Sequence, residues 1–122
     1  MGPSFHISID RDRSLMRLKL SGFFDRSSVA KMVVERNAAV KRLGCAPNMH
    51  VTFCDLSDYV LSSPEIVGEF QTMVADPRYS SRRLAFVIDA SLARMQVRRI
   101  AKRTDVGYFL SADEAETWLF AA

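Results

Sequence analysis

The stretch Leu84-Ala85-Phe86-Val87-Ile88-Asp89 decides the fold class of this 122-residue chain. A short continuous apolar run that is closed by an acid is typical of a strand covered on both faces. Helical patterns precede and follow this run, so the strands on either side of it need crossover connections. The sequence therefore predicts an α/β domain in which residues 84–88 form a central, largely parallel strand.

The remaining strands follow from the alternation of polar and apolar residues. Residues 6–10 and 15–22 alternate in this way and predict a hairpin that turns across residues 11–14. Residues 49–56 predict the next strand, and residues 106–110 predict the last one. With the central stretch, these segments make five strands.

Four helices are predicted from their caps. Asp25 or Ser27 begins the first, which Gly44 ends, and Ser62-Ser63-Pro64-Glu65 begins the second, which ends at Asp76-Pro77. The third runs from residue 92, capped by Ser91, to about residue 103. A capping box over residues 111–114 begins the last helix, which ends near residue 120. The order ββαβαβαβα predicts a single domain over residues 1–122, with a mixed five-stranded sheet and four helices.

The composition is that of an ordinary globular protein. With 48% hydrophobic and 25% charged residues, and only 5 Gly and 4 Pro, the chain is not collagen-like, disordered or of low complexity. Charges interrupt every apolar run well before the roughly 18 residues of a membrane span. No secretory signal is visible at the start, and 2 Cys are too few for a disulfide framework. We therefore expect a cytoplasmic protein with reduced thiols.

Three segments resemble the SpoIIAA-like family, whose fold is similar to that of the STAS domain and, more distantly, to the lipid-binding CRAL-TRIO domain. They are the acid-ended strand at 51–55, the stretch from Arg83 to Met95, and the ending Glu114-Ala115-Glu116-Thr117-Trp118-Leu119. The resemblance spans nearly the whole chain and implies a regulatory module. In antagonist domains of this kind, a serine at the start of the second helix is phosphorylated.

The matching stretch here is Leu61-Ser62-Ser63-Pro64. The resemblance therefore implies Ser62 or Ser63 as a phosphorylation site that alters partner binding. Leu61 stands where an acid is expected, however, and Pro64 where a glycine is expected. The alternative is that one of the two serines only caps the helix.

Strand ends supply the other candidate polar site. Asp55 and Asp89 follow predicted strands, at the sheet edge where open parallel sheets hold ligands, and Asp25 could join them in an acidic pocket. The alternative is that these aspartates cap turns and helices. His50 and Cys54 are about 13 Å apart along a strand, too far to share a metal ion, and Cys54 is predicted to be a buried structural residue. We therefore expect no metal, no cofactor and no enzymatic activity, because no acid, base and nucleophile converge.

Basic residues concentrate between residues 78 and 103. This segment holds eight of them against Asp89 alone, a local charge of +7 in a chain whose total is +3. On the third helix, Arg94, Arg98 and Lys102 share one side with Met95, whereas Leu92, Val97 and other apolar residues occupy the opposite side. One alternative is that these arginines pair with Glu114 or Glu116; another is that they contact a partner.

The leading interpretation is a non-catalytic protein-interaction module. Its partner or ligand surface comprises Ser62, Ser63, Asp55, Asp89, Arg94, Met95, Arg98 and Lys102. The partner is an unknown protein, with peripheral membrane contact and a homodimer contact through Phe120 as further options. No nucleic acid is expected, because exposed aromatics and a helix-turn-helix pattern are lacking. The alternative function is binding of a small apolar or lipid-like ligand between sheet and helices, near Met32, Phe53, Phe70, Met73 and Phe86.

Overall fold

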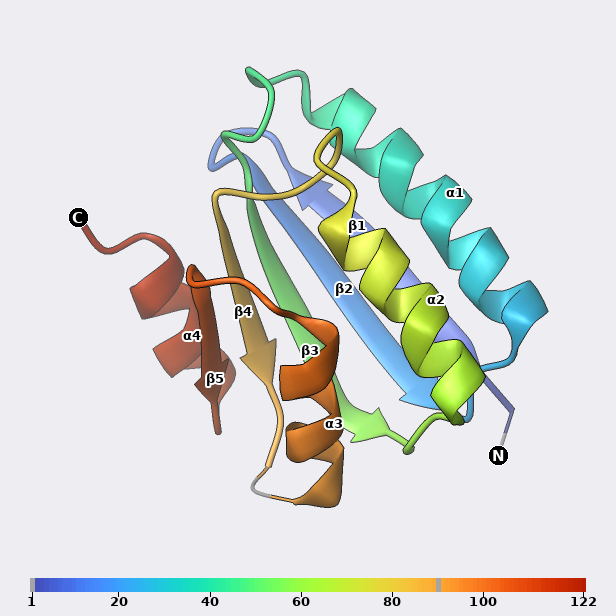
Figure 1. Cartoon of the computed structure of the whole chain (residues 1–122). Coiled ribbons are helices and arrows are strands. Elements are labelled where there is room, and N and C mark those ends of the chain that lie inside the picture. Colours follow the sequence, from blue (N-terminus) through green and yellow to red (C-terminus); the bar gives the residue numbers. More distant parts are fainter. Residues whose placement is uncertain (1, 90) are drawn as a thin grey trace.

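The computed structural model describes residues 2–89 and 91–122, and its framework is one five-stranded sheet (Figure 1). The strands are β1 (Ser4–Asp10), β2 (Leu15–Gly22), β3 (Val51–Tyr59), β4 (Arg83–Val87) and β5 (Val106–Phe109). They lie side by side in chain order. β1 pairs with β2 in antiparallel fashion and all other neighbours are parallel, so the predicted mixed sheet is confirmed.

The helices lie on both faces of the sheet. They are α1 (Arg26–Leu43), α2 (Pro64–Ala75), α3 (Leu92–Ile100) and α4 (Ala112–Leu119). Between β2 and β5, each connection leads to the adjacent strand, always in the same direction across the sheet. Because these connections have the same handedness, their helices lie on the same face of the sheet. α1, α2 and α3 cover this front face, whereas α4 packs on the back face against β3, β4 and β5 (Figure 1).

Most predicted helix ends are confirmed. The Asp25 Oδ1 atom accepts a hydrogen bond from the Ser28 backbone N–H at 2.8 Å, and Gly44 ends α1 with φ of 69°. Ser111 caps α4. Ser91 occupies the cap position of α3, but its side chain makes no capping hydrogen bond. At the start of α2 the cap is Ser63, so that Pro64 is the first helical residue.

Two element ends differ from the prediction. β3 continues through Ser57 and Asp58 to Tyr59, because β2 continues to pair with it as far as Gly22. The polar residues in this stretch had predicted a loop. α3 ends at Ile100 rather than near Arg103, whose guanidinium instead donates to Asp105 and to the Ser81 carbonyl at 2.5 Å. These contacts take the chain away from the helix.

Two hydrophobic clusters sandwich the central strands. The larger lies on the front face below α1, α2 and α3 and includes Leu84 and Phe86. The smaller lies on the back face below α4, and its members are Leu15, Val51, Phe53, Ala85, Ala115 and Leu119. β4 contributes to both clusters, as predicted for a strand covered on both faces, but the middle strand of the sheet is β3 and β4 lies between β3 and the edge strand β5.

α4 leaves the β1 and β2 half of the back face uncovered by any described helix. Polar side chains occupy this half: the Lys19 ammonium lies 3.3 Å from the Asp55 carboxylate and 3.2 Å from that of Asp58. Arg17 forms an ion pair with Glu116 of α4. None of the described helices has the length and apolarity needed to cross a membrane.

Candidate functional site

A hydrogen-bond network joins the start of α2 to α3. The Gln96 Oε1 atom accepts from the Tyr59 hydroxyl at 2.8 Å and from the Ser62 backbone N–H at 2.9 Å. The Gln96 Nε2 atom donates to the Ser62 carbonyl at 2.8 Å. The two predicted parts of the partner surface are therefore in direct contact. Sequence reasoning missed Tyr59 and Gln96, because nothing in their local pattern shows that they face each other.

The two candidate serines have different environments. Ser62 is 8% exposed, and its hydroxyl lies 2.7 Å from that of Tyr59. Ser63 is half-buried, and its Oγ accepts from the Ile66 backbone N–H at 3.4 Å. The predicted helix cap is thus confirmed for Ser63. The hydroxyl of Ser62 is buried in the junction between α2 and α3, and so it is the less accessible of the two.

The outer side of α3 carries both cationic and apolar groups. We define the α3 surface as Leu92, Arg94, Met95, Arg98 and Lys102. Met95 is 54% exposed, as predicted, and Leu92 is 68% exposed. The prediction that Leu92 packs inward was wrong, because only the later turns of α3 reach the sheet, through the buried Val97 and Ile100. Lys102 lies just after the helix and is exposed.

Within the described part of the chain, some basic residues of the segment 78–103 form ion pairs, and others do not. Arg78 pairs with Asp76, and Arg103 pairs with Asp105. Arg83 points to the back face, where it donates to the Trp118 carbonyl. Within residues 2–89 and 91–122, by contrast, no carboxylate lies within ion-pair distance of any basic residue of the α3 surface.

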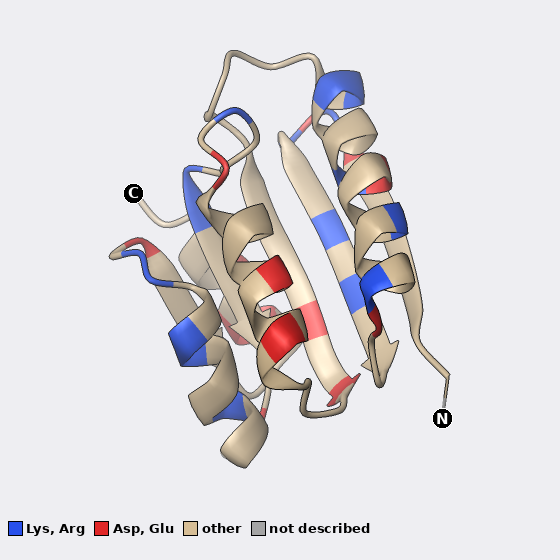
Figure 2. Cartoon of the chain, turned by 45° about the vertical axis from the view of Figure 1, so that its right-hand side comes forward, with Lys and Arg blue, Asp and Glu red and all other residues tan. Residues whose placement is uncertain are grey.

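The predicted pairing of the α3 arginines with Glu114 or Glu116 was wrong. Both glutamates belong to α4 on the opposite face of the sheet, where Glu116 pairs with Arg17. The glutamates of the neighbouring helix α2 pair with α1 instead: Glu65 and Glu69 both contact Arg26. The positive charge on α3 therefore remains facing outward (Figure 2).

Tyr108 holds two of these arginines in place. The guanidinium carbons of Arg94 and Arg98 lie 5.7 Å and 4.6 Å from the centre of the Tyr108 ring. That ring stacks on Phe86 with the ring centres 5.6 Å apart. A shallow basin between α3 and β5 is lined by Tyr108, the two arginines and Lys102. The positive charges of Arg94 and Arg98 therefore lie against a packed pair of aromatic rings.

The expected acidic pocket does not form. Asp55 lies within β3 on the back face, where it accepts from the Ser57 backbone N–H at 2.9 Å. Partial burial acts to raise its pKa, but hydrogen bonds from Ser57 and Lys19 outweigh burial and lower it. Asp25 caps α1, and Asp89 is exposed beyond β4. No cluster of His, Cys, Asp and Glu that could hold a metal ion occurs in the described parts of the chain. The alternative interpretation, that such aspartates cap turns and helices, is confirmed for Asp25, whereas Asp55 accepts its hydrogen bonds from Ser57 within the strand.

Cys54 is a buried residue of the front core, as predicted. It is 4% exposed, and burial raises the pKa of its thiol far above the usual value. His50 is 1% exposed, and burial together with the nearby charges of Arg36 and Arg103 lowers its pKa to about 4. Within the described residues, neither His50 nitrogen has a hydrogen-bond partner, so the imidazole is not placed to take the proton of the Cys54 thiol.

A cavity of about 70 Å³ lies between the sheet and helices α2 and α3. This is the region of the alternative ligand site, and Phe70, Met73 and Phe86 line it as expected. The other two expected residues do not. Phe53 belongs to the back cluster, and Met32 is fully buried in the front core away from the cavity lining.

Solved structures of similar shape match almost the entire chain. An uncharacterized protein from Shewanella loihica PV-4, described as having a SpoIIAA-like fold, matches with a TM-score of 0.74 and 16% identity. The match covers 97% of this chain and 94% of that one. This chain has the SpoIIAA-like fold. The fold that the sequence resemblance implied is therefore confirmed.

A second structure extends the comparison to a protein with a stated role. An anti-sigma factor antagonist from Mycobacterium paratuberculosis has a TM-score of 0.66 and 12% identity, over 97% of this chain and 94% of that one. No family model and no curated protein matches the sequence. At such identities the likeness concerns the SpoIIAA-like fold, and the function has to be argued from the surface.

Proposed function

We propose that the chain is a non-catalytic regulatory module that binds an acidic protein partner through the α3 surface. The observation that carries this proposal is the cationic surface itself, whose arginines and lysine have no carboxylate partner within the described residues. Unpaired cations beside exposed apolar side chains are complementary to a partner segment that carries both acids and apolar residues.

The apolar residues supply the second part of the argument. Leu92 and Met95 are more than half exposed at the centre of the basic surface. Covering them with a partner removes apolar area from water, and arginine is enriched where such contacts dominate binding. The fold shared with an anti-sigma factor antagonist supports a role in binding protein rather than in catalysis. A cytoplasmic location is part of this proposal, and peripheral membrane contact stays an expectation from the sequence.

The start of α2 is the regulatory part of the proposal. Phosphorylation of Ser63 would put negative charge at the N-terminus of α2, where the helix dipole stabilises it. The Gln96 network connects this point to α3. Ser63 is favoured over Ser62 because the hydroxyl of Ser62 is buried against Tyr59. The added charge would lie beside the cationic partner surface and weaken its attraction for acids.

Charge reversal on α3 tests the partner surface. Proteins retained by the tagged chain from extract of its own cells are quantified for the wild type, for Arg94→Glu/Arg98→Glu and for the control Arg42→Glu, an exposed residue of α1. We expect acidic proteins to be lost from the double variant and kept by the control, with retention falling as salt rises. Equal retention by all three proteins would contradict the proposal.

Phosphorylation is tested separately by intact mass after incubation with cell extract and ATP. We expect one added phosphate on the wild type and on Ser62→Ala, and none on Ser63→Ala. Modification that persists in Ser63→Ala would reject Ser63 as the site. An unmodified wild type, in an extract that phosphorylates other substrates, would reject the regulatory step but leave the partner surface intact.

A further inference from the structure

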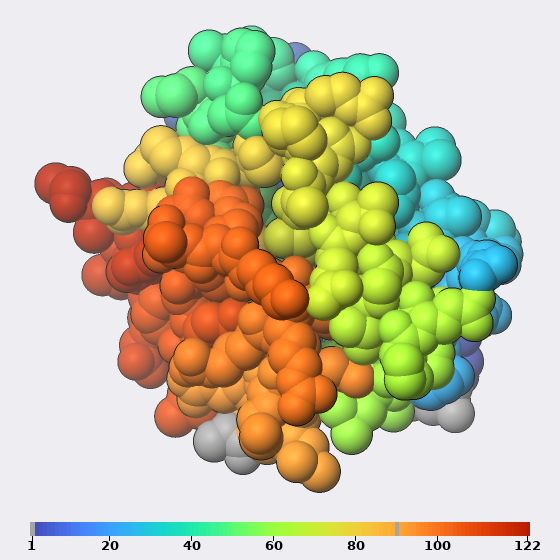
Figure 3. All heavy atoms as spheres, in the orientation of Figure 1, coloured from blue at the N-terminus to red at the C-terminus, as the bar shows by residue number. Residues whose placement is uncertain are grey.

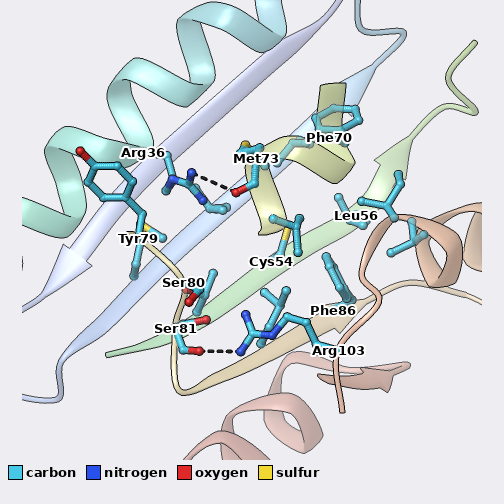
Figure 4. Close-up of a pocket in the computed structure, with 18 of the residues that line it drawn as sticks. Arg36, Cys54, Leu56, Phe70, Met73, Tyr79, Ser80, Ser81, Phe86 and Arg103 are labelled. Atoms are coloured by element: carbon cyan, nitrogen blue, oxygen red, sulfur yellow. Dashed lines mark hydrogen bonds between the residues drawn. The ribbon is translucent and has the colours of Figure 1, made fainter. Parts of the chain in front are cut away.

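The front cavity has an apolar body and a polar end. Its walls include Leu84, Phe86, Val97 and Ile100. Arg36, Tyr79, Ser80, Ser81 and Arg103 gather on its polar side, as Figure 4 shows. On the molecular surface, α2 meets α3 and the segment after it along a narrow seam (Figure 3). The cavity is thus a buried space with charge at one end.

Arg36 is the main cation at that end. It lies on the inward side of α1 and is only 6% exposed. Its Nε donates to the Asn37 Oδ1 atom at 2.8 Å and its Nη2 to the Met73 carbonyl at 3.1 Å. Its guanidinium also lies 5.5 Å from the centre of the Tyr79 ring. None of these contacts is a carboxylate.

The described residues supply no counter-charge for Arg36. The acid whose charge acts on Arg36 is Asp76. The two carboxylate oxygens of Asp76 already accept hydrogen bonds from Arg78 at about 3 Å. Arg103, which also lines the cavity, is already paired with Asp105. A buried cation without an anion is costly, and its remaining N–H groups are free to bind an acceptor that enters the cavity.

His50 adds an independent observation. Both ring nitrogens are buried, and neither has a hydrogen-bond partner within the described residues. His50 precedes β3 on the same side of the sheet as Thr52, which lines the cavity. Burial and the positive charges of Arg36 and Arg103 lower the pKa of its imidazole. Orphaned buried polar groups of this kind are normally satisfied by a water or a ligand. His50 does not itself line the cavity but lies next to Thr52, whereas the Arg36 guanidinium, which has no carboxylate partner within the described residues, does line it.

We propose that this cavity binds a short-chain aliphatic carboxylate, with its carboxylate on the free N–H groups of Arg36 and its chain among Phe86, Val97 and Ile100. The volume sets the length: a cavity of about 150 Å³ accepts the six carbons of benzene, so about 70 Å³ accommodates about three carbons, the propyl chain of butyrate, when the carboxylate lies against Arg36. The site is separate from the α3 surface, and its occupation does not depend on a protein partner.

Binding of butyrate is measured by amide and methyl chemical shifts in the intact protein. We expect saturable shifts at Met73, Ser81 and Val97, none with 1-butanol, which lacks the charge, and none with decanoate, which is too long. In Arg36→Met we expect butyrate to bind about ten- to a hundredfold more weakly. The control Arg42→Met, an exposed residue of the same helix, should bind as the wild type does.

A second variant keeps the proposal testable if Arg36→Met does not fold. Cys54→Met enlarges a side chain that lines the cavity without changing any charge, and it should abolish the butyrate shifts. Thermal unfolding of each variant checks that the fold persists. The proposal is rejected if the wild type shows no butyrate shifts up to about 20 mM. Butyrate binding that Arg36→Met leaves unchanged, or equal binding of 1-butanol, would also reject it.

Discussion

His50 shows how one residue links burial to stability. The imidazole is buried beside two guanidinium groups, which disfavour its protonated form, and so its pKa falls to about 4 from the usual 6.5. The unfolded chain therefore binds a proton between these two pH values that the folded chain does not. By linkage, the free energy of unfolding decreases as the pH falls through this window.

The first prediction concerns this window. Between pH 7 and pH 4 the wild type should lose about 3 kcal/mol of stability through His50, and His50→Leu should lose less by about that amount. At pH 7 the leucine variant should be as stable as the wild type or more so, because it removes two unsatisfied nitrogens. Urea unfolding at several pH values measures both effects.

The matched control is His6→Leu, which changes an exposed histidine on the edge strand. Its stability curve should follow that of the wild type across the same pH range. If His50→Leu and His6→Leu gave the same curve, the buried imidazole would not be the group responsible. An NMR titration of the His50 ring, which should stay neutral down to about pH 4, provides a direct check.

At the scale of elements, the contact between α2 and α3 depends on one glutamine. Gln96 makes three of the hydrogen bonds at this junction, and Tyr59 and Ser62 have their polar atoms there. We predict that Gln96→Leu destabilises the chain by about 1–3 kcal/mol, because it leaves buried partners unsatisfied. Chemical denaturation measures the change, and faster amide hydrogen exchange at Ser62 should accompany it.

Gln71→Leu is the comparison for this junction. Its Nε2 donates to the Arg99 carbonyl at 3.1 Å, also between α2 and α3, but in an exposed position where water can replace it. Its effect should be smaller than that of Gln96→Leu. A larger effect would mean that the buried network does not hold the two helices together.

Two glycines give opposite predictions for their elements. A Cβ at Gly107 in β5 would lie 2.5 Å from the Phe109 ring and 3.2 Å from Trp118, so Gly107→Ala should destabilise by about 1–3 kcal/mol through overpacking. A Cβ at Gly68 in α2 meets nothing within 4 Å, and Gly68→Ala should stabilise by about 0.5–1 kcal/mol. Thermal unfolding of both variants tests the pair, and a shift of the same sign in both would contradict the packing of α4 on β5.

At the scale of the whole molecule, two cores share the same strands. β3 and β4 place alternate side chains in the front cluster and in the back cluster. Loss of α4 would expose one face of both strands to water, and loss of the front helices would expose the other. The two cores therefore depend on each other although no side chain belongs to both.

This arrangement predicts a single unfolding transition. Trp118, the one tryptophan of the chain, packs at the edge of the back cluster with its ring centre 5.6 Å from that of Phe109. Its fluorescence should change at the same denaturant concentration as the helical circular dichroism, most of which comes from α1, α2 and α3. An earlier change in fluorescence would show that α4 and β5 melt independently.

The strands and helices were largely predictable because their signals are local. The run at residues 84–88, Asp25, Gly44 and the capping box at residue 111 all act within a few positions of themselves. The end of β3 was not predictable, because pairing with β2 extends it through polar residues. Of the candidate site, the exposed Met95 was predicted, whereas the exposure of Leu92 depends on how α3 meets the sheet.

The amino-acid order alone determined which segments are strands or helices, that the sheet is mixed, and that a basic surface lies on the third helix. Apolar periodicity and capping side chains are sufficient for that, since they operate over short distances along the chain. Only the tertiary structure decided that α4 lies on the opposite face from α3, that Asp55 lies on the back face of the sheet, and that Arg36 lines a cavity between the sheet and the front helices. Those outcomes depend on crossover hand and on packing between residues far apart in sequence, which no local pattern encodes.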